Sequence, residues 1–315
     1  MCPKVSVIIL NWNNPQDTLQ CLESAHKIDY PTFEILIVDN GSSDNSCELI
    51  TANFPNDLLI KNKKNLGFAE GNNIAIKVAL KNNADYIFFL NNDAVVSPDI
   101  LSVLVSHAQK IPKAGALGPK IFNFDFTRTL QNVGFFWLSH LANFAALKDH
   151  VIKKSIEEKN CIPVDFVTGC AFLVSRKVIE KVGFMDGRFF LIWEEIDWQM
   201  RMKKAGYCNI VIPFTHVWHK NSASFVGGNE GIIKRYFFFR NRLLFIEKNL
   251  SFKEKTQIYL KVFPKEILAY FKHTYLSKNT SNFLKKRYKG YFLGMRDYFF
   301  RRFGNCPAHF YDKYK

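Results

Sequence analysis

Three short segments that are apolar at nearly every position constrain the fold of this chain more than any other feature. They read VSVIIL (5–10), FEILIVD (33–39) and DYIFFL (85–90), and they are rich in β-branched and aromatic residues. Continuous apolar runs of this length indicate strands that are buried on both faces. Because segments with helical periodicity lie between them, the pattern predicts an α/β fold, with a mostly parallel central sheet and helices on both faces.

The helices between these strands have recognisable starting points. Pro15 can begin the first helix, and Ser43 or Asp44 can cap the second. A third helix is predicted over residues 68–83, and Pro98 can begin a fourth. The first part of the chain therefore has the alternation of a doubly wound sheet.

The later part of the pattern is less regular. Residues 123–162 are expected to form loops and a short strand. Residues 165–183 then predict a strand followed by a helix that ends at Gly183. An amphipathic helix is expected over 194–206, and a further strand over 207–213.

The net charge of +15 is concentrated at one end of the chain. From Gly231 onward there are 20 Lys and Arg residues but only 5 Asp and Glu residues, whereas the residues before it carry equal numbers of the two. This change in composition predicts a boundary near Gly228. It would separate a first domain, residues 1–228, from a basic, aromatic-rich helical extension over 229–315.

The seven cysteines show no pattern of a disulfide framework or a zinc site, because their number is odd and no CxxC pair occurs. A reducing cytosol is the expected compartment. The apolar run near the N-terminus is too short for a signal peptide. No segment approaches the roughly 18 consecutive apolar residues of a membrane-spanning helix, so neither export nor a membrane span is expected.

Polar residues follow all three buried strands directly. Asn11 and Asn13 follow the first, Asp39 ends the second, and the third runs into residues 91–93. Ligands of such sheets bind outside the carboxyl ends of the strands, so one crevice should collect these side chains. A carboxylate after a buried strand needs a partner, and Asp39 could accept a hydrogen bond from a nucleotide base. A simple tight turn over 40–43 is the alternative.

Two further loops can be interpreted in either of two ways. Asn91, Asn92 and Asp93 offer hard oxygen ligands for Mg²⁺ or Mn²⁺ bound together with substrate phosphates, or Asp93 caps the next helix. Asn65 and Gly67 open a helix whose N-terminus could seat polar groups of a ligand, or they form an ordinary loop-to-helix junction. That loop carries neither the Walker pattern nor the G-x-G-x-x-G fingerprint.

Three acids stand together at the start of a later helix, at Glu194, Glu195 and Asp197, among aromatic residues. An apolar wall raises the pKa of a carboxyl group toward the range useful for a general base. Acids in a first helical turn also commonly serve only to complement the helix dipole. His216 and His219 follow in a late strand, and one of them could complete a metal site, although a single histidine is usually structural.

In order and spacing, these stretches resemble family 2 glycosyltransferases of the GT-A fold, especially the rhamnosyltransferase-like branch that builds bacterial surface polysaccharides. The resemblance covers about residues 4–250 and implies a nucleotide-binding half over about 1–122 and an acceptor half over about 123–228. Together with the residue patterns it gives a set of expected donor-binding residues. They are Asn11, Asn13, Asp39, Asn65, Gly67, Asn91, Asn92, Asp93, Gly169 and Cys170.

The resemblance also implies individual roles. Asp39 corresponds to the carboxylate that contacts the nucleotide base, and residues 91–93 correspond to the D-x-D motif that holds the metal and the diphosphate. Glu194 and Glu195 correspond to the Glu-Asp pair, whose second member is the base. His219 corresponds to a late histidine that is a metal ligand in some members.

Two residues depart from the family pattern. Asn91 stands where the first acid is expected, which removes one charge from the metal site and should make metal binding more dependent on the diphosphate. Asn is common there in this branch. Glu195 stands where Asp is usual, and its extra methylene shifts the carboxylate, so Glu194 and Asp197 remain alternative bases.

The resemblance implies an inverting, metal-dependent hexosyltransferase that uses a nucleotide-diphosphate sugar, with dTDP-rhamnose suggested by the branch and UDP-sugars left open. The acceptor would be a hydroxyl of a glycan or a lipid-linked glycan in surface polysaccharide synthesis. A non-catalytic sugar- or lipid-binding protein that keeps the fold is the alternative. An NAD-dependent oxidoreductase is disfavoured because the glycine fingerprint is missing.

The basic extension has three interpretations. We expect peripheral attachment to anionic lipid on the inner face of the membrane, because the segments 235–245 and 285–303 mix Lys and Arg with aromatics. A solvated helical cap on the first domain is the plain alternative. Nucleic-acid binding is disfavoured, because no RNA- or DNA-binding motif accompanies the charge.

Overall fold

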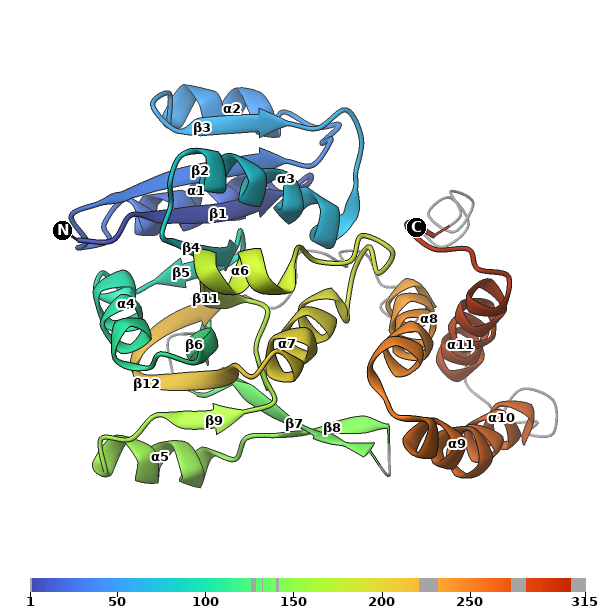
Figure 1. Ribbon diagram of the computed structural model, residues 1–315. Coiled ribbons are helices and arrows are strands. Elements are labelled where there is room, and N and C mark those ends of the chain that lie inside the picture. Colours follow the sequence, from blue (N-terminus) through green and yellow to red (C-terminus); the bar gives the residue numbers. More distant parts are fainter. Residues whose placement is uncertain are drawn as a thin grey trace.

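The computed structural model describes residues 2–125, 129–131, 133–139, 142–220, 232–272 and 282–306. The chain forms a nine-stranded sheet in the order β3-β2-β1-β4-β11-β6-β12-β5, with β9 paired to β12. Figure 1 shows α3, α6 and α7 on the near face of this sheet and α1 and α2 behind it. The α/β fold with helices on both faces is therefore confirmed.

The first half of the sheet is parallel, as its continuous apolar strands predict. Its strands are β1 (Val5–Asn11), β2 (Phe33–Asp39), β3 (Leu58–Lys61) and β4 (Tyr86–Asn91), and its helices are α1 (Pro15–Ala25), α2 (Ser46–Asn53) and α3 (Gly67–Lys81). In the register of the sheet, Asn11 lies beside Asp39, and Leu10 lies beside Asn91. The polar residues that end these strands are therefore neighbours at one edge.

The second half of the sheet mixes directions, because β11 is antiparallel to both β4 and β6, whereas β12 is parallel to β6. Its strands are β5 (Ala94–Val96), β6 (Ala114–Asn123), β9 (Ile162–Val164), β11 (Ala171–Ser175) and β12 (Cys208–His219). A separate sheet has the order β10-β7-β8, formed by β10 (Phe166–Val167), β7 (Gly134–Leu138) and β8 (Asn143–Ala146). The helices here are α4 (Ile100–Lys110), α5 (Asp149–Glu157), α6 (Arg176–Val182) and α7 (Glu194–Lys204).

Helix α5 corrects the prediction of loops and a short strand over 123–162. Only Ile152 and Ser155 of this helix are buried. A nine-residue helix with so small a buried face has too few apolar positions to produce a clear period in the sequence. By contrast, Gly183 ends α6 as expected, with φ at 80°.

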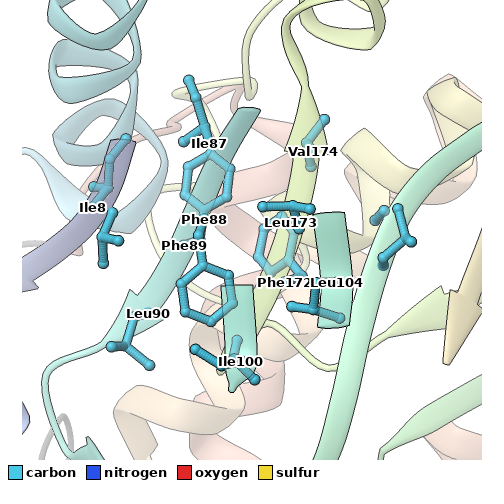
Figure 2. Packing of buried hydrophobic residues seen from close by; sticks show 14 of the residues in the cluster. Ile8, Ile87, Phe88, Phe89, Leu90, Ile100, Leu104, Phe172, Leu173 and Val174 are labelled. Atoms are coloured by element: carbon cyan, nitrogen blue, oxygen red, sulfur yellow. The ribbon is translucent and has the colours of Figure 1, made fainter. Parts of the chain in front are cut away.

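The main core lies between the central strands and the helices that cover them. Figure 2 shows Phe88, Phe89, Leu173 and Val174 among the side chains packed there. Phe89 stacks on Phe172 at 4.7 Å between ring centroids, and the ring of Trp198 on α7 meets it edge-on. This packing attaches α7, which carries the acidic cluster, to the middle of the sheet.

The C-terminal region is helical, as predicted. It consists of α8 (Ile232–Asn249), α9 (Phe252–Lys261), α10 (Phe263–Phe271) and α11 (Asn282–Phe299). Helix α8 shares a core with the rest of the chain, in which Phe245 contacts the rings of Phe166 and Trp193. The expected boundary near Gly228 lies outside the described residues. Within the described ranges, no helix is both long and apolar enough to span a bilayer.

Candidate active site

The ends of the first two strands are joined by a hydrogen-bond network. Asn11 Nδ2 donates to Asp39 Oδ1 at 2.8 Å, and the backbone N–H of Ser42 donates to Asp39 Oδ2 at 3.0 Å. Asn13 accepts from the N–H of Ser43 at 2.8 Å. Asp39 is buried, so these donors compensate its loss of water. The network brings Asn11, Asn13 and Asp39 together, as expected.

Asn40 organises the loop before α3, a role that the sequence interpretation missed. Its side chain donates to Asn65 Oδ1 and to the carbonyl of Gly67, and it accepts from Asn62 and from the N–H of Leu66, all at 3.1 Å. From the sequence, a tight turn over 40–43 is one alternative for this residue, and only the structure shows that its side chain is buried. The side-chain amide of Asn40 thus holds Asn65 and Gly67 close to the end of β2, where Asp39 lies.

Gly67 also fixes the position of a distant loop. Its φ is +82°, and a Cβ there would lie only 2.4 Å from the carbonyl oxygen of Phe190. The N–H of Phe68 donates to that same oxygen at 2.6 Å. The close approach therefore requires glycine, and it brings the segment before α7 against the N-terminus of α3.

The candidate metal ligands meet at the end of β4. Asp93 Oδ1 lies 3.1 Å from His219 Nε2, and both side chains are buried. Asn91 Nδ2 lies 3.4 Å from the same ring nitrogen. Asn92 differs, because its amide donates to Thr18 at 2.9 Å.

A second residue orients the histidine and was not foreseen. Gln131 Oε1 lies 3.1 Å from His219 Nδ1, and Gln131 Nε2 donates to the His219 carbonyl at 2.8 Å. This contact directs Nε2 toward Asp93, as partners on the far nitrogen do in metal sites. His216 lies on the opposite side of β12, where its ring meets Trp218 and Phe122 edge-on.

The donor set fits a divalent ion that arrives with a phosphate ligand. Among the described residues, no group of three or more His, Cys, Asp or Glu side chains could hold a metal. Asp93 and His219 supply two ligands of the types used by Mn²⁺ and Mg²⁺, and phosphate oxygens would supply others. Burial opposes protonation of His219, but Cys170 and Asp93 outweigh it and raise its pKa to about 10. A bound metal would therefore displace a proton from this pair.

The turn before β11 connects the metal ligands with the acidic helix. The carbonyl of Cys170 accepts from the N–H of Asn91 at 2.8 Å, and its thiol hydrogen-bonds to His219. The neighbouring Gly169 faces Glu195, because a Cβ on this glycine would lie 3.0 Å from Glu195 Cγ and 3.1 Å from its Oε1. Asp93, His219 and Glu195 therefore border one turn.

Glu194 and Glu195 have the properties of a buried acid pair. Glu194 is 3% exposed, while Glu195 is partly exposed. Each has an Oε2 atom that is buried and accepts no hydrogen bond within the described part of the chain. Burial raises the pKa of both carboxyl groups, and for Glu194 the charge of Glu195 raises it further. Glu195 combines a raised pKa with a partly exposed side chain.

Asp197 corrects the list of alternative bases. It is fully buried, and its carboxylate accepts from Arg201 at 3.0 Å, Lys248 at 2.9 Å and Asn249 at 2.7 Å. Both of its oxygens therefore accept hydrogen bonds, two of them from cationic side chains. Asp197 joins α7 to α8 and is not exposed to a substrate.

The segment that leads into the acid pair is held in an unusual conformation by α8. Phe190, Ile192 and Trp193 all have positive φ angles, of 64°, 67° and 82°. Asn241 Nδ2 donates to the carbonyls of Phe189, Leu191 and Ile192 at 2.7–2.8 Å. Left-handed backbone at non-glycine residues persists only where surrounding contacts impose it. The sequence interpretation assigned no role to this amide.

Replacement of Asn241 by Ala is expected to lower both stability and activity. The carbonyls of Leu191 and Ile192 would lose this donor, whereas that of Phe189 would keep Arg240 Nη2 at 3.0 Å. Each orphaned group costs about 1–3 kcal/mol, so we expect the free energy of unfolding to fall by about 2–4 kcal/mol in total. The loop would also relax and displace Glu195. Urea unfolding measures the first effect and single-turnover transfer the second. Asn53→Ala, which removes an exposed amide, should change neither quantity, and wild-type rates in Asn241→Ala would contradict the positioning role.

A comparison with protein-family models identifies the family. The model described as glycosyl transferase family 2 matches residues 6–183, more than half of the chain. The chain belongs to glycosyl transferase family 2. This match covers the candidate nucleotide and metal residues up to Cys170, whereas Glu195 and His219 lie beyond it.

Curated relatives agree with this assignment. The glycosyltransferase is 27% identical over 212 residues to N-acetylglucosaminyl-diphospho-decaprenol L-rhamnosyltransferase of Mycobacterium tuberculosis (strain CDC 1551 / Oshkosh), which spans 60% of this chain and 67% of that protein. It is 28% identical over 236 residues to O-antigen biosynthesis protein RfbC of Myxococcus xanthus, covering 70% of this chain but 18% of that protein. The rhamnosyltransferase-like resemblance is thus confirmed.

Solved structures confirm the GT-A fold. GalNAc-T7, solved with UDP, GalNAc and Mn²⁺, has a TM-score of 0.63 at 14% identity, with 94% of this chain and 56% of that chain covered. Mannosyltransferase PcManGT from Pyrobaculum calidifontis, solved in complex with GDP-Man and Mn²⁺, has a TM-score of 0.59 at 14% identity, with 96% and 88% covered. At this level of identity the likeness concerns the fold.

Proposed function

We propose that this glycosyltransferase transfers a sugar from a nucleotide-diphosphate donor to a hydroxyl group of a surface-glycan acceptor, with inversion at the anomeric carbon. The observation that carries the proposal is the turn at Gly169 and Cys170. It borders the pair Asp93–His219 on one side and Glu195 on the other. This shared turn supports a diphosphate site and a proton acceptor that lie close together.

In this proposal the chemistry is a single displacement. The acceptor oxygen forms a bond to the anomeric carbon while the bond from that carbon to the diphosphate oxygen breaks. Glu195 takes the proton of the acceptor hydroxyl, and the nucleoside diphosphate leaves with the bonding electron pair. Attack opposite to the leaving group inverts the configuration, as in inverting glycosidases.

A divalent cation is part of the proposal. The solved neighbours that contain Mn²⁺ support it, and Asp93 and His219 would hold the ion. When bound, Mg²⁺ or Mn²⁺ would neutralise negative charge on the departing diphosphate. Asn91 and Asn92 would border the same group, while Asp39 with Asn11 and Asn13 would border the nucleotide, and Asn65 with Gly67 would support that site.

The proposed donor and acceptor follow from the relatives. A rhamnosyltransferase and an O-antigen biosynthesis protein favour dTDP-rhamnose and a glycan or lipid-linked glycan of the cell surface. UDP-sugars remain candidate donors, because this chain is also similar to a poly-β-1,6-N-acetyl-D-glucosamine synthase of Staphylococcus epidermidis. We assign nucleotide binding to residues 1–122 and acceptor binding to 123–228.

The test is a donor screen followed by a transfer assay. Thermal shift with dTDP-rhamnose, UDP-galactofuranose and UDP-N-acetylglucosamine, each with Mn²⁺ or Mg²⁺, identifies the donor, since a ligand of the folded state raises the melting temperature. Release of free nucleoside diphosphate on addition of a lipid-linked glycan then measures transfer. Donor binding without release for any acceptor of this class would favour the alternative, a non-catalytic sugar-binding protein.

A further inference from the structure

Large exposed apolar side chains gather on α9 and α10. Phe252 is 85% exposed, Leu260 is 71% exposed and Leu268 is 69% exposed. Tyr259, Ile267 and Phe271 add to the same two helices, each more than a third exposed. The buried residues Ile258 and Phe263 turn toward the other helices, so the two helices have opposite faces of different character. We call the exposed side of α9 and α10 the outer face.

The outer face lies between the two segments, 235–245 and 285–303, from which membrane attachment is expected on sequence grounds. The basic aromatic segment 235–245 forms the middle of α8, where Phe237, Phe239 and Phe245 are buried. Two of its three arginines are also internal, because Arg240 and Arg242 are 0% and 4% exposed, whereas Arg235 is partly exposed. Most of this segment therefore stabilises the core.

Cationic side chains surround the apolar residues of the outer face. Lys253, Lys261, Lys265 and Lys272 are exposed along α9 and α10. The two acids of these helices are engaged elsewhere, and each has a defined partner. Glu254 closes the capping box with Ser251, and Glu266 pairs with Arg242 at 2.9 Å. The outer face therefore combines exposed phenylalanine and leucine with an excess of positive charge.

We propose that the outer face of α9 and α10 is a docking surface for a bilayer rich in anionic lipid. Helices with this composition lie in the plane of the interface, with apolar side chains in the acyl boundary and lysines at the headgroups. A second copy of the chain fits less well, because pairing two such faces would bring their lysines together. An anionic headgroup layer matches both the charge and the apolar side chains.

This docking surface is distinct from the proposed sugar-transfer site and would bring the enzyme to a lipid-linked acceptor. In Figure 1, α9 and α10 lie below α8 and α11, at the lower end of the C-terminal helices. Another exposed aromatic pair, Phe299 and Phe300, lies at the C-terminal end of α11, and each is 66% exposed. Because exposed Arg301 and Arg302 follow it directly, that pair provides a comparison patch of similar composition at another place on the surface.

The test is flotation of the full chain with vesicles, which needs no sugar transfer. We expect the wild type to float with phosphatidylcholine–phosphatidylglycerol vesicles and not with phosphatidylcholine alone. Leu260→Ser combined with Leu268→Ser should weaken this binding about tenfold or more, because two apolar anchors are lost. Lys261→Gln combined with Lys265→Gln should weaken binding to anionic vesicles, and Phe299→Ser combined with Phe300→Ser should leave it unchanged.

Several results would overturn the docking surface. These are absence of flotation of the wild type, equal flotation with neutral vesicles, or an equal loss in the Phe299 and Phe300 variant. Concentration-dependent dimers in sedimentation that disappear in the Leu260 and Leu268 variant, without vesicle binding, would assign the face to a second copy instead. Circular dichroism on each variant confirms that loss of binding is not loss of folding. Transfer activity can fail or succeed independently of every one of these outcomes.

Discussion

Replacement of Glu195 by Gln is expected to reduce sugar transfer by about a hundredfold or more while leaving donor binding nearly intact. A general base contributes about 10²–10⁴-fold to the rate. Gln keeps the shape of the side chain against Gly169 but cannot accept the proton. Single-turnover release of nucleoside diphosphate measures the rate, and thermal shift by the donor measures binding.

The pH dependence gives a second measurement of the same residue. Burial raises the pKa of Glu195 above the ordinary value of 4.5, and only the deprotonated carboxylate can act as a base. Transfer should therefore be lost as the pH falls through this raised pKa, at a higher pH than an exposed glutamate would give. Glu194→Gln is the matched control, because it changes the neighbouring carboxyl to an amide of the same shape and should retain transfer, with the limb still set by the burial of Glu195. Full turnover by Glu195→Gln would move the base elsewhere.

Replacement of Asp93 by Ala is expected to remove most metal-dependent donor binding and to lower kcat/KM by about a hundredfold or more. Even partners of metal ligands commonly contribute 10–100-fold to affinity, and Asp93 is the one carboxylate facing His219 among the described ion pairs. Titration of Mn²⁺ in the presence of nucleoside diphosphate, followed by calorimetry, gives a readout that does not depend on turnover. EDTA should reproduce the loss in the wild type, and added Mn²⁺ should restore it.

A control separates this effect from a general loss of charge. Asp57→Ala removes a carboxylate that pairs with His26 at 2.8 Å on another part of the surface, and it should bind metal and donor normally. If Asp93→Ala bound Mn²⁺ and nucleoside diphosphate as well as the wild type, or if EDTA left transfer unchanged, the metal site would have to be abandoned.

The sequence determined the parts of this protein that depend on local pattern. Strands buried on both faces are apolar at nearly every position, so β1, β2 and β4 and the polar residues after them could be predicted. The order of those loops then indicated the family and the residues Asp39, Asp93 and His219. The acidic start of α7 was also visible, because three acids among aromatics are rare in a chain segment.

Only the tertiary structure decided which side chains support the site. Gln131 contacts His219 across 88 positions, and Asn241 contacts Phe189 across 52. Neither amide has a period or a motif, since a buried amide is recognisable only by the carbonyls that it meets. For the same reason, the sequence could not distinguish Asp197 from a candidate base, because its three hydrogen-bond donors are known only from the structure. It also could not show that the aromatic residues of α8 are buried. The periodicity of a sequence indicates which side chains are buried. The hydrogen-bond partner of a buried side chain depends instead on which distant segments the tertiary fold brings together.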